Sequence, residues 1–281
     1  MIYNRIDERQ YLIPLSRRVP FFYIEKSMLV KKHELFCRAY RVAGKIVYES
    51  IPIATISAIV CGPGTSITNE AMRLASLRGC IVFFSGGYGV PVFAKSSFAR
   101  SSKNKINQYQ KFTQLRGEVI KAFLEERRSV IESNGDCSTP KLSLKNLNEN
   151  NYLSIEGNWV KRAYKWAANK HDVCWTTRKE MMDNRKHPLI FLNHLLYTLS
   201  SSIISHLNLD HDLSAIHSRN KGGGLIYDLA DIYKPLITLE QGMMHEKEGS
   251  SMGQIKKRFI NDIYDHDVIS KSIKFLKRVL K

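Results

Sequence analysis

The chain has 281 residues, of which 43% are hydrophobic and 10% aromatic, enough to bury a core in one or two domains. Lysine and arginine number 43 against 26 acidic residues, so the formal net charge is +17 and the isoelectric point about 9.7. This net charge is far from the near-neutral value of most cytosolic enzymes. It indicates a polyanionic partner, either nucleic acid or an anionic membrane surface.

The first predicted domain, residues 1–95, is rich in short β-type runs separated by glycines and other turn residues. These runs are residues 19–24, 35–42, 46–48, 53–60, 80–84 and 90–94. One helix is predicted over residues 69–78, because Thr68 can cap its free amides, Glu70 suits the positive end of the dipole, and Gly79 can close the helix. We therefore predict a β-rich domain with one short helix.

Residues 96–106 are small, polar and basic, as expected of an exposed linker between domains. Over residues 107–281 the apolar residues recur about every 3.6 positions, which predicts helices. The apolar stripes cover residues 109–123, 155–167, 192–207, 255–263 and 273–280, and the polar stretch 133–151 predicts a loop. The predicted fold class is α+β, with an all-α C-terminal domain.

Membrane insertion and disulfide bonding are both disfavoured. The most apolar stretch, residues 189–207, contains Asn193, His194 and three consecutive serines, so we expect no membrane span. The charged N-terminus lacks the apolar run of a secretory signal, which predicts a cytoplasmic protein. The five cysteines form no Cys-x-x-Cys pair, and we expect reduced thiols rather than a disulfide framework or a zinc site.

The most informative stretch is a basic, glycine-rich loop that follows His217 and leads into an apolar segment carrying Asp228 and Asp231. In a helix these two carboxylates would lie on one face, where they could share a hard cation, and the glycines would let His217 fold back over that face. An ordinary loop followed by a capping aspartate gives the same pattern, so both interpretations stay open. Glu156 follows a potential Ser154 cap, and its local pattern favours a first-turn glutamate stabilised by the helix dipole.

Several motifs, in one order, resemble the family of the CRISPR-associated integrase. The first half contains SIPIA (50–54), GPGTSIT (62–68), AMRLA (71–75) and FFSGGYGVPVF (83–93). The second half contains EGNWVKRAY (156–164), NHLLY (193–197), His217 and YDLAD (227–231). The resemblance runs from about residue 18 to beyond residue 240 and is greatest to the type I-F branch, with type I-E next.

The resemblance implies a reaction centre of Glu156, His217, Asp228 and Asp231, in which Glu156, His217 and Asp231 would bind the metal. Carboxylates with one imidazole suit Mg²⁺ or Mn²⁺. The implied activity is that of a metal-dependent DNA integrase and endonuclease of CRISPR adaptation. It would join the 3′-hydroxyl ends of captured DNA, the prespacer, to the repeat of a CRISPR array by transesterification.

The resemblance also implies partners. These are double-stranded DNA (prespacer and CRISPR repeat), a second copy of the chain bound through the first domain, and a small ferredoxin-like CRISPR adaptation protein, which in type I-F is fused to the helicase-nuclease. The predicted DNA contacts are Arg73, Arg78, Arg162, Lys165, Arg219, Lys221 and Tyr227. Taken alone, each basic residue favours a solvated surface charge over a DNA contact. The alternatives are a non-catalytic DNA-binding scaffold and a structure-specific nuclease acting on branched DNA in repair.

Overall fold

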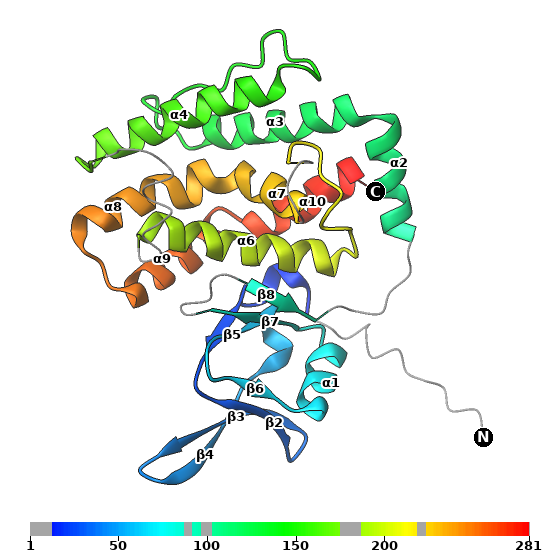
Figure 1. Cartoon of the computed structure of the whole chain (residues 1–281), viewed down its shortest axis with the longest axis vertical. Helices are drawn as coiled ribbons and strands as arrows, with labels where there is room; N and C mark the ends of the chain where they lie inside the picture. The colour runs from blue at the N-terminus through cyan, green and yellow to red at the C-terminus, as the bar shows by residue number, and fades with distance from the viewer. Residues whose placement is uncertain (1–12, 87–91, 97–102, 175–186, 218–222, 281) are drawn as a thin grey trace. The chain divides into compact units, whose positions relative to one another are not determined.

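The computed structural model describes residues 13–86, 92–96, 103–174, 187–217 and 223–280 (Figure 1). The chain divides into two compact units, residues 1–99 and 100–281. The described strands and helix α1 belong to the first unit, and the other α-helices belong to the second, so the fold is α+β as predicted.

The division falls within the predicted linker 96–106, of which residues 97–102 lie outside the described part of the chain. The last four residues of that predicted linker are helical, because α2 (Lys103–Gln114) already begins there. Asn104 explains this early start, since its side-chain amide donates to the carbonyl of Leu207 at 2.7 Å and so anchors the first turn of α2 within the second unit.

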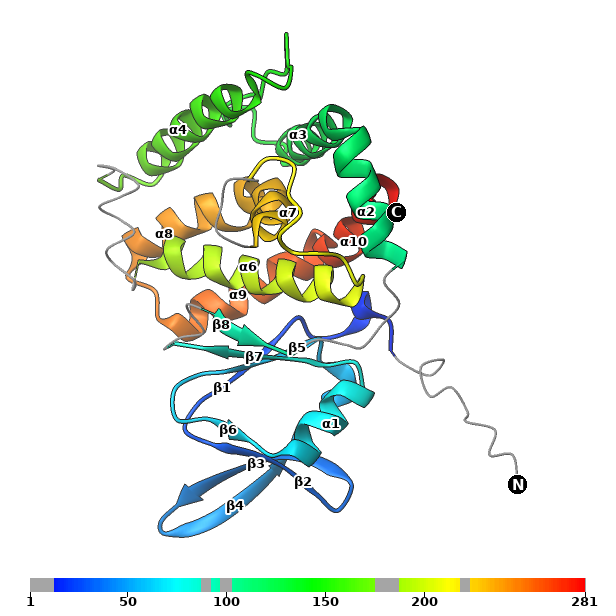
Figure 2. The same cartoon turned by 45° about the vertical axis from the view of Figure 1, so that its right-hand side comes forward.

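The first unit contains two four-stranded sheets with α1 (Asn69–Leu77) packed between them (Figure 2). One sheet has the order β1-β5-β7-β8 and the other β4-β3-β2-β6. The strands are β1 (Phe22–Ile24), β2 (Met28–Lys32), β3 (Leu35–Val42), β4 (Lys45–Ser50), β5 (Ala58–Cys61), β6 (Ser66–Ile67), β7 (Ile81–Ser85) and β8 (Val92–Lys95). Parallel pairing joins β1, β5 and β7, and antiparallel pairing joins β2, β3 and β4.

Two local predictions for this unit were incomplete. Strand β2 was not predicted, because two of its five residues are lysines, yet it pairs with both β3 and β6. The run 53–60 begins as a 3₁₀ turn, Ile53–Thr55, directly after Pro52. The predicted cap of α1 is confirmed: Thr68 Oγ1 accepts from the amide of Ala71 at 3.3 Å, a contact of the kind that contributes about 1 kcal/mol.

The second unit is helical, and α7 lies against α3 and α6 within it (Figures 1 and 2). Its α-helices are α2, α3 (Arg116–Ser133), α4 (Tyr152–Lys170), α6 (Pro188–His206), α7 (Gly224–Lys234), α8 (Glu240–Glu248), α9 (Met252–Asp265) and α10 (Val268–Leu280). A π-helical turn, Pro235–Leu239, joins α7 to α8, and neither this turn nor α8 was predicted. The predicted loop 133–151 is non-helical from residue 134 onward.

Helix α6 is long and apolar enough to cross a membrane by length and composition alone, although its sequence predicted no span. In the structure 78% of its most apolar 18-residue stretch is buried, as in a core helix. One of its buried polar residues, Asn193, has a partner there, because Thr238 Oγ1 donates to Asn193 Oδ1 at 2.7 Å. The five cysteines are all free thiols, of which Cys37, Cys61 and Cys80 are buried.

Candidate metal centre

Two helices and one loop bring the predicted ligands together. On α4, Glu156 belongs to the buried face, between the core residues Tyr152 and Trp159. On α7, Asp231 is likewise on the buried face. The loop that follows α6 supplies His217, whose side chain is about one quarter exposed. Residues far apart in the sequence therefore meet within the helical unit.

One nitrogen or oxygen of each of Glu156, His217 and Asp231 lies within 4.8 Å of the others. The imidazole Nε2 of His217 is 3.6 Å from Asp231 Oδ2. A Mg²⁺ or Mn²⁺ ion holds its ligands at about 2.0–2.3 Å, so opposite ligands of one ion are roughly 4–4.5 Å apart. The spacing and the mixed carboxylate and imidazole donors fit a single divalent cation of this kind, and the structure itself identifies no ion.

Asp228 is directed toward the loop that carries His217. Its Oδ2 accepts from Ser214 Oγ at 2.8 Å and from the amides of Ala215 at 2.8 Å and Ile216 at 3.3 Å. Its Oδ1 accepts from the amide of His217 at 3.0 Å and lies 2.8 Å from His217 Nδ1.

Asp228 is not one of the three clustered residues, as expected for the predicted metal ligands Glu156, His217 and Asp231, and both of its oxygens already accept hydrogen bonds. We call Ser214, Ala215, Ile216 and His217 the cradle. Asp228 binds the cradle and fixes His217 Nδ1 as a donor, which leaves Nε2 directed toward Asp231. It is therefore a positioning residue.

Gly224 lets the cradle approach the first turn of α7. A Cβ at this position would lie 2.5 Å from the Cβ of Ser214 and 2.9 Å from the carbonyl oxygen of His217. Only a residue without a side chain fits this close approach. The glycine-rich pattern thus has a structural function at Gly224, whereas residues 218–222 lie outside the described part of the chain.

Lys234 neutralises Asp231. Its Nζ forms a close ion pair with Asp231 Oδ1, one turn further along α7, and it lies 4.7 Å above the ring of Tyr197. Burial alone would raise the pKa of Asp231, but the charges of Lys234, Arg127 and His217 outweigh burial and hold this pKa at about 2. Asp231 is therefore an ionised carboxylate at neutral pH.

Arg127 neutralises Glu156 in a similar way. Its Nη1 lies 2.9 Å from Glu156 Oε1, and the guanidinium stacks 4.5 Å from the ring of Trp159. Neither Arg127 nor Lys234 was predicted as part of the site. The sequence held a clue to both: Arg127 continues the apolar stripe of α3, where a charge needs a partner, and Lys234 follows Asp231 by three residues.

The acidic neighbours also act on His217. Burial lowers the pKa of this imidazole, but its hydrogen bond to Asp228 and the charges of Asp231 and Glu156 outweigh burial and raise the pKa above its ordinary value. The cluster thus favours a positive charge at the position of the imidazole. A divalent cation bound to Nε2 would supply such a charge.

Tyr227, one of the predicted DNA contacts, lies beside the cluster. Its ring centroid is 5.9 Å from that of His217, and it packs edge-on against Tyr197 at 4.9 Å. Tyr227 is only half-buried, so part of its surface stays open to a ligand next to the candidate metal centre.

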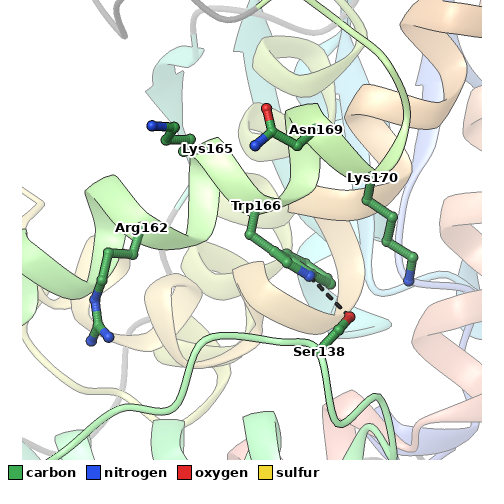
Figure 3. Close-up of a pocket in the computed structure, with 6 residues that line it drawn as sticks. All are labelled: Ser138, Arg162, Lys165, Trp166, Asn169 and Lys170. Atoms are coloured by element: carbon green, nitrogen blue, oxygen red, sulfur yellow. Dashed lines mark hydrogen bonds between the residues drawn. The ribbon is translucent and has the colours of Figure 1, made fainter.

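The predicted basic contacts lie on several elements. Arg73 and Arg78 are exposed on and directly after α1 in the first unit. On α4, Arg162 and Lys165 line a shallow pocket of about 620 Å³ (Figure 3). Arg219 and Lys221 lie outside the described residues.

The pocket on α4 also contains an aromatic side chain. Trp166 is held there because its Nε1 donates to Ser138 Oγ at 3.0 Å (Figure 3). Lys170 lies 5.1 Å from the centre of the Trp166 ring and is paired with Asp136 at 2.6 Å. Arg162 and Lys165 thus lie beside a tryptophan on an exposed, basic surface of the helix.

Comparison with known proteins gives one consistent family. Residues 24–240 match the family model described as CRISPR associated protein Cas1. The chain is 24% identical to a CRISPR-associated endonuclease Cas1 of Pectobacterium atrosepticum, over 94% of this chain and 93% of that protein.

Solved structures show the same fold. A crystal structure of a Cas1 protein in complex with DNA superposes with a TM-score of 0.73 at 21% identity, covering 93% of this chain and 91% of that one. A casposase bound to its integration product gives a TM-score of 0.71 at 14% identity, covering 92% of this chain and 90% of that one. The span that matches the family model, residues 24–240, contains the positions of all four residues of the predicted reaction centre.

Proposed function

This chain belongs to the Cas1 family of CRISPR-associated proteins, and on that premise we propose that it is a metal-dependent DNA integrase and endonuclease of CRISPR adaptation. The observation that carries the proposal is the cluster of Glu156, His217 and Asp231, with donor atoms within 4.8 Å of one another. Similar proteins support it: a CRISPR-associated endonuclease, a Cas1 protein in complex with DNA and a casposase bound to its integration product. The type I-F assignment stays a prediction.

The reaction we propose is a transesterification. The 3′-hydroxyl oxygen of the captured DNA forms a bond to a repeat phosphorus, the bond from that phosphorus to the 3′ oxygen of the repeat strand breaks, and the hydroxyl proton passes to that leaving oxygen by way of solvent. A bound Mg²⁺ or Mn²⁺ would supply Lewis acidity to the phosphate and lower the pKa of the attacking hydroxyl.

The protein's own groups prepare the site. Glu156, His217 and Asp231 would hold the ion, and Asp228 keeps His217 Nε2 directed toward Asp231. Lys234 keeps Asp231 ionised, and Arg127 holds Glu156 in place.

DNA would be held by the basic surface of a chain whose net charge is +17. We propose phosphate contacts from Arg73 and Arg78 on the first unit and from Arg162 and Lys165 at the pocket on α4. Tyr227, beside His217, would contact the scissile phosphate or the attacking hydroxyl. Arg219 and Lys221 belong to the same proposal on sequence grounds.

We also propose a homodimer formed through the first unit. Strand β4 is the outer strand of its sheet in the described part of the chain, and all six of its residues are exposed. Ile46, Val47 and Tyr48 present apolar surface on this edge, and an unpaired edge of this kind favours pairing with another chain. The ferredoxin-like adaptation protein and the cytoplasmic location remain proposals from the family resemblance.

The test uses the purified chain with its adaptation partner, Mn²⁺ or Mg²⁺, a short duplex with free 3′ ends and a supercoiled plasmid carrying a repeat. We expect joined product that is absent with Asp231→Asn or Glu156→Gln. A scaffold would bind DNA equally well without metal and would be unaffected by either variant. A repair nuclease would cleave branched DNA with no preference for the repeat. Either of these results would overturn the integrase proposal.

A further inference from the structure

The loop between α6 and the cradle is attached to helix α2 by one buried side chain, Gln108, which has no exposed surface. Its Nε2 donates to the carbonyl of Asp210 at 2.9 Å and to that of Leu213 at 3.2 Å. Its Oε1 accepts from the amide of Asp210 at 2.7 Å. Both donor hydrogens and the acceptor are therefore occupied by loop backbone 102 or more residues away in the sequence.

These bonds act directly on the start of the cradle. The carbonyl of Leu213 and the amide of Ser214 belong to one planar peptide unit, so holding the carbonyl sets the direction in which the cradle begins. The next three amides and Ser214 Oγ all donate to Asp228. The last cradle residue, His217, directs Nε2 toward Asp231.

We propose that Gln108 is a positioning residue of the metal centre: through Asp210 and Leu213 it sets the cradle, and through the cradle and Asp228 it sets the imidazole of His217. A buried amide with its donors and acceptor satisfied holds one backbone conformation, because any other conformation leaves polar groups unpaired. This inference rests on the proposed metal centre. It adds a residue from α2, an element that contributes no ligand.

A matched control lies one turn earlier on the same helix. Asn104 also donates from its amide to a loop carbonyl, but its partner is Leu207, directly after α6 and six residues before Leu213. Asn104→Ala therefore removes a similar contact between α2 and the chain after α6 without touching the peptide that begins the cradle.

The experiment measures Mn²⁺ affinity of the full chain by electron paramagnetic resonance, with circular dichroism and thermal unfolding on the same samples. Gln108→Met keeps the length of the side chain and removes all three hydrogen bonds. We expect Mn²⁺ binding weaker by about tenfold, the lower end of the range for partners outside the coordination sphere. For Asn104→Ala we expect a change below twofold.

A Gln108→Met protein that is folded and binds Mn²⁺ as the unmodified chain does would overturn the inference, even if its unfolding temperature fell. Equal weakening in Asn104→Ala would overturn it as well, because the effect would then be general loosening of the loop. If Gln108→Met does not fold, Gln108→Asn takes its place, because this variant retains a buried amide on a side chain that is one methylene shorter. A folded Gln108→Asn protein that binds Mn²⁺ as the unmodified chain does would likewise overturn the inference. Failure of the unmodified chain to bind Mn²⁺ would instead refute the proposed metal centre.

Discussion

Replacing Asp228 by asparagine tests the positioning of His217 most directly. The carboxylate receives five donors on two oxygens, and an amide offers only one oxygen. If that oxygen stays with the three donors at Oδ2, the NH₂ group faces the amide and Nδ1 of His217. Hydrogen bonds to a charged group contribute about 1.5–3 kcal/mol each, so losing two lowers the free energy of unfolding by about 3 kcal/mol or more.

The same change alters the imidazole. Facing an NH₂ group, His217 Nδ1 must accept, which moves the ring proton to Nε2, the nitrogen directed toward Asp231. That nitrogen then has no lone pair for a metal. Loss of the hydrogen-bond partner of a metal-binding histidine commonly weakens metal binding 10- to 100-fold, which corresponds to about 1.4–2.7 kcal/mol of binding free energy.

The assay is a Mn²⁺ titration of Asp228→Asn, followed by urea unfolding of the metal-free protein. Asp136→Asn is the charge-matched control, because Asp136 is a carboxylate of the loop before α4 that pairs with Lys170 and takes no part in the cradle. We expect the control to retain its Mn²⁺ affinity. A folded Asp228→Asn protein with Mn²⁺ affinity within twofold of the unmodified chain would refute the assigned role of Asp228.

Three further substitutions probe the surroundings of the site. Gly224→Ala places a Cβ 2.5 Å from the Cβ of Ser214, and we expect it to lower the free energy of unfolding by about 1–3 kcal/mol. The measurement is urea denaturation, in which an unchanged unfolding midpoint would contradict the close packing. Arg127→Met removes the partner of the buried carboxylate of Glu156, and we expect it to lower the free energy of unfolding by about 3–5 kcal/mol in the same assay. An unchanged free energy of unfolding would contradict this ion pair. Lys234→Met tests the pH dependence of stability through Asp231. The pKa of Asp231 is about 2 in the folded protein, below its value in the unfolded chain. Ionised Asp231 therefore stabilises the folded protein above about pH 4, and this stabilisation is lost as the pH falls toward 2. Without Lys234, burial raises this pKa, so we expect the variant to lose stability, relative to the unmodified chain, as the pH rises toward neutrality; parallel pH profiles of the unfolding temperature would contradict this.

Much of the secondary structure follows from patterns within a few residues. The cap at Thr68, the strands around Ile59 and Val82 and the stripe of α3 depend on neighbours two to four positions away, so periodicity predicts them. Glu156 is the exception among the proposed ligands, because its local pattern favours an ordinary first-turn glutamate. Only resemblance to the family indicated it as a ligand.

The role of Asp228 could not be predicted in this way, because it depends on the amides of a loop without regular structure. Those amides point at Asp228 only when the loop is folded as it is here, and the loop is held by Gln108, 102 or more residues away in the sequence. Arg127 and Glu156 likewise meet from different helices, 29 residues apart. Periodicity describes what each segment buries, whereas the direction of a backbone amide and the partner of a buried charge are set by which segments pack together.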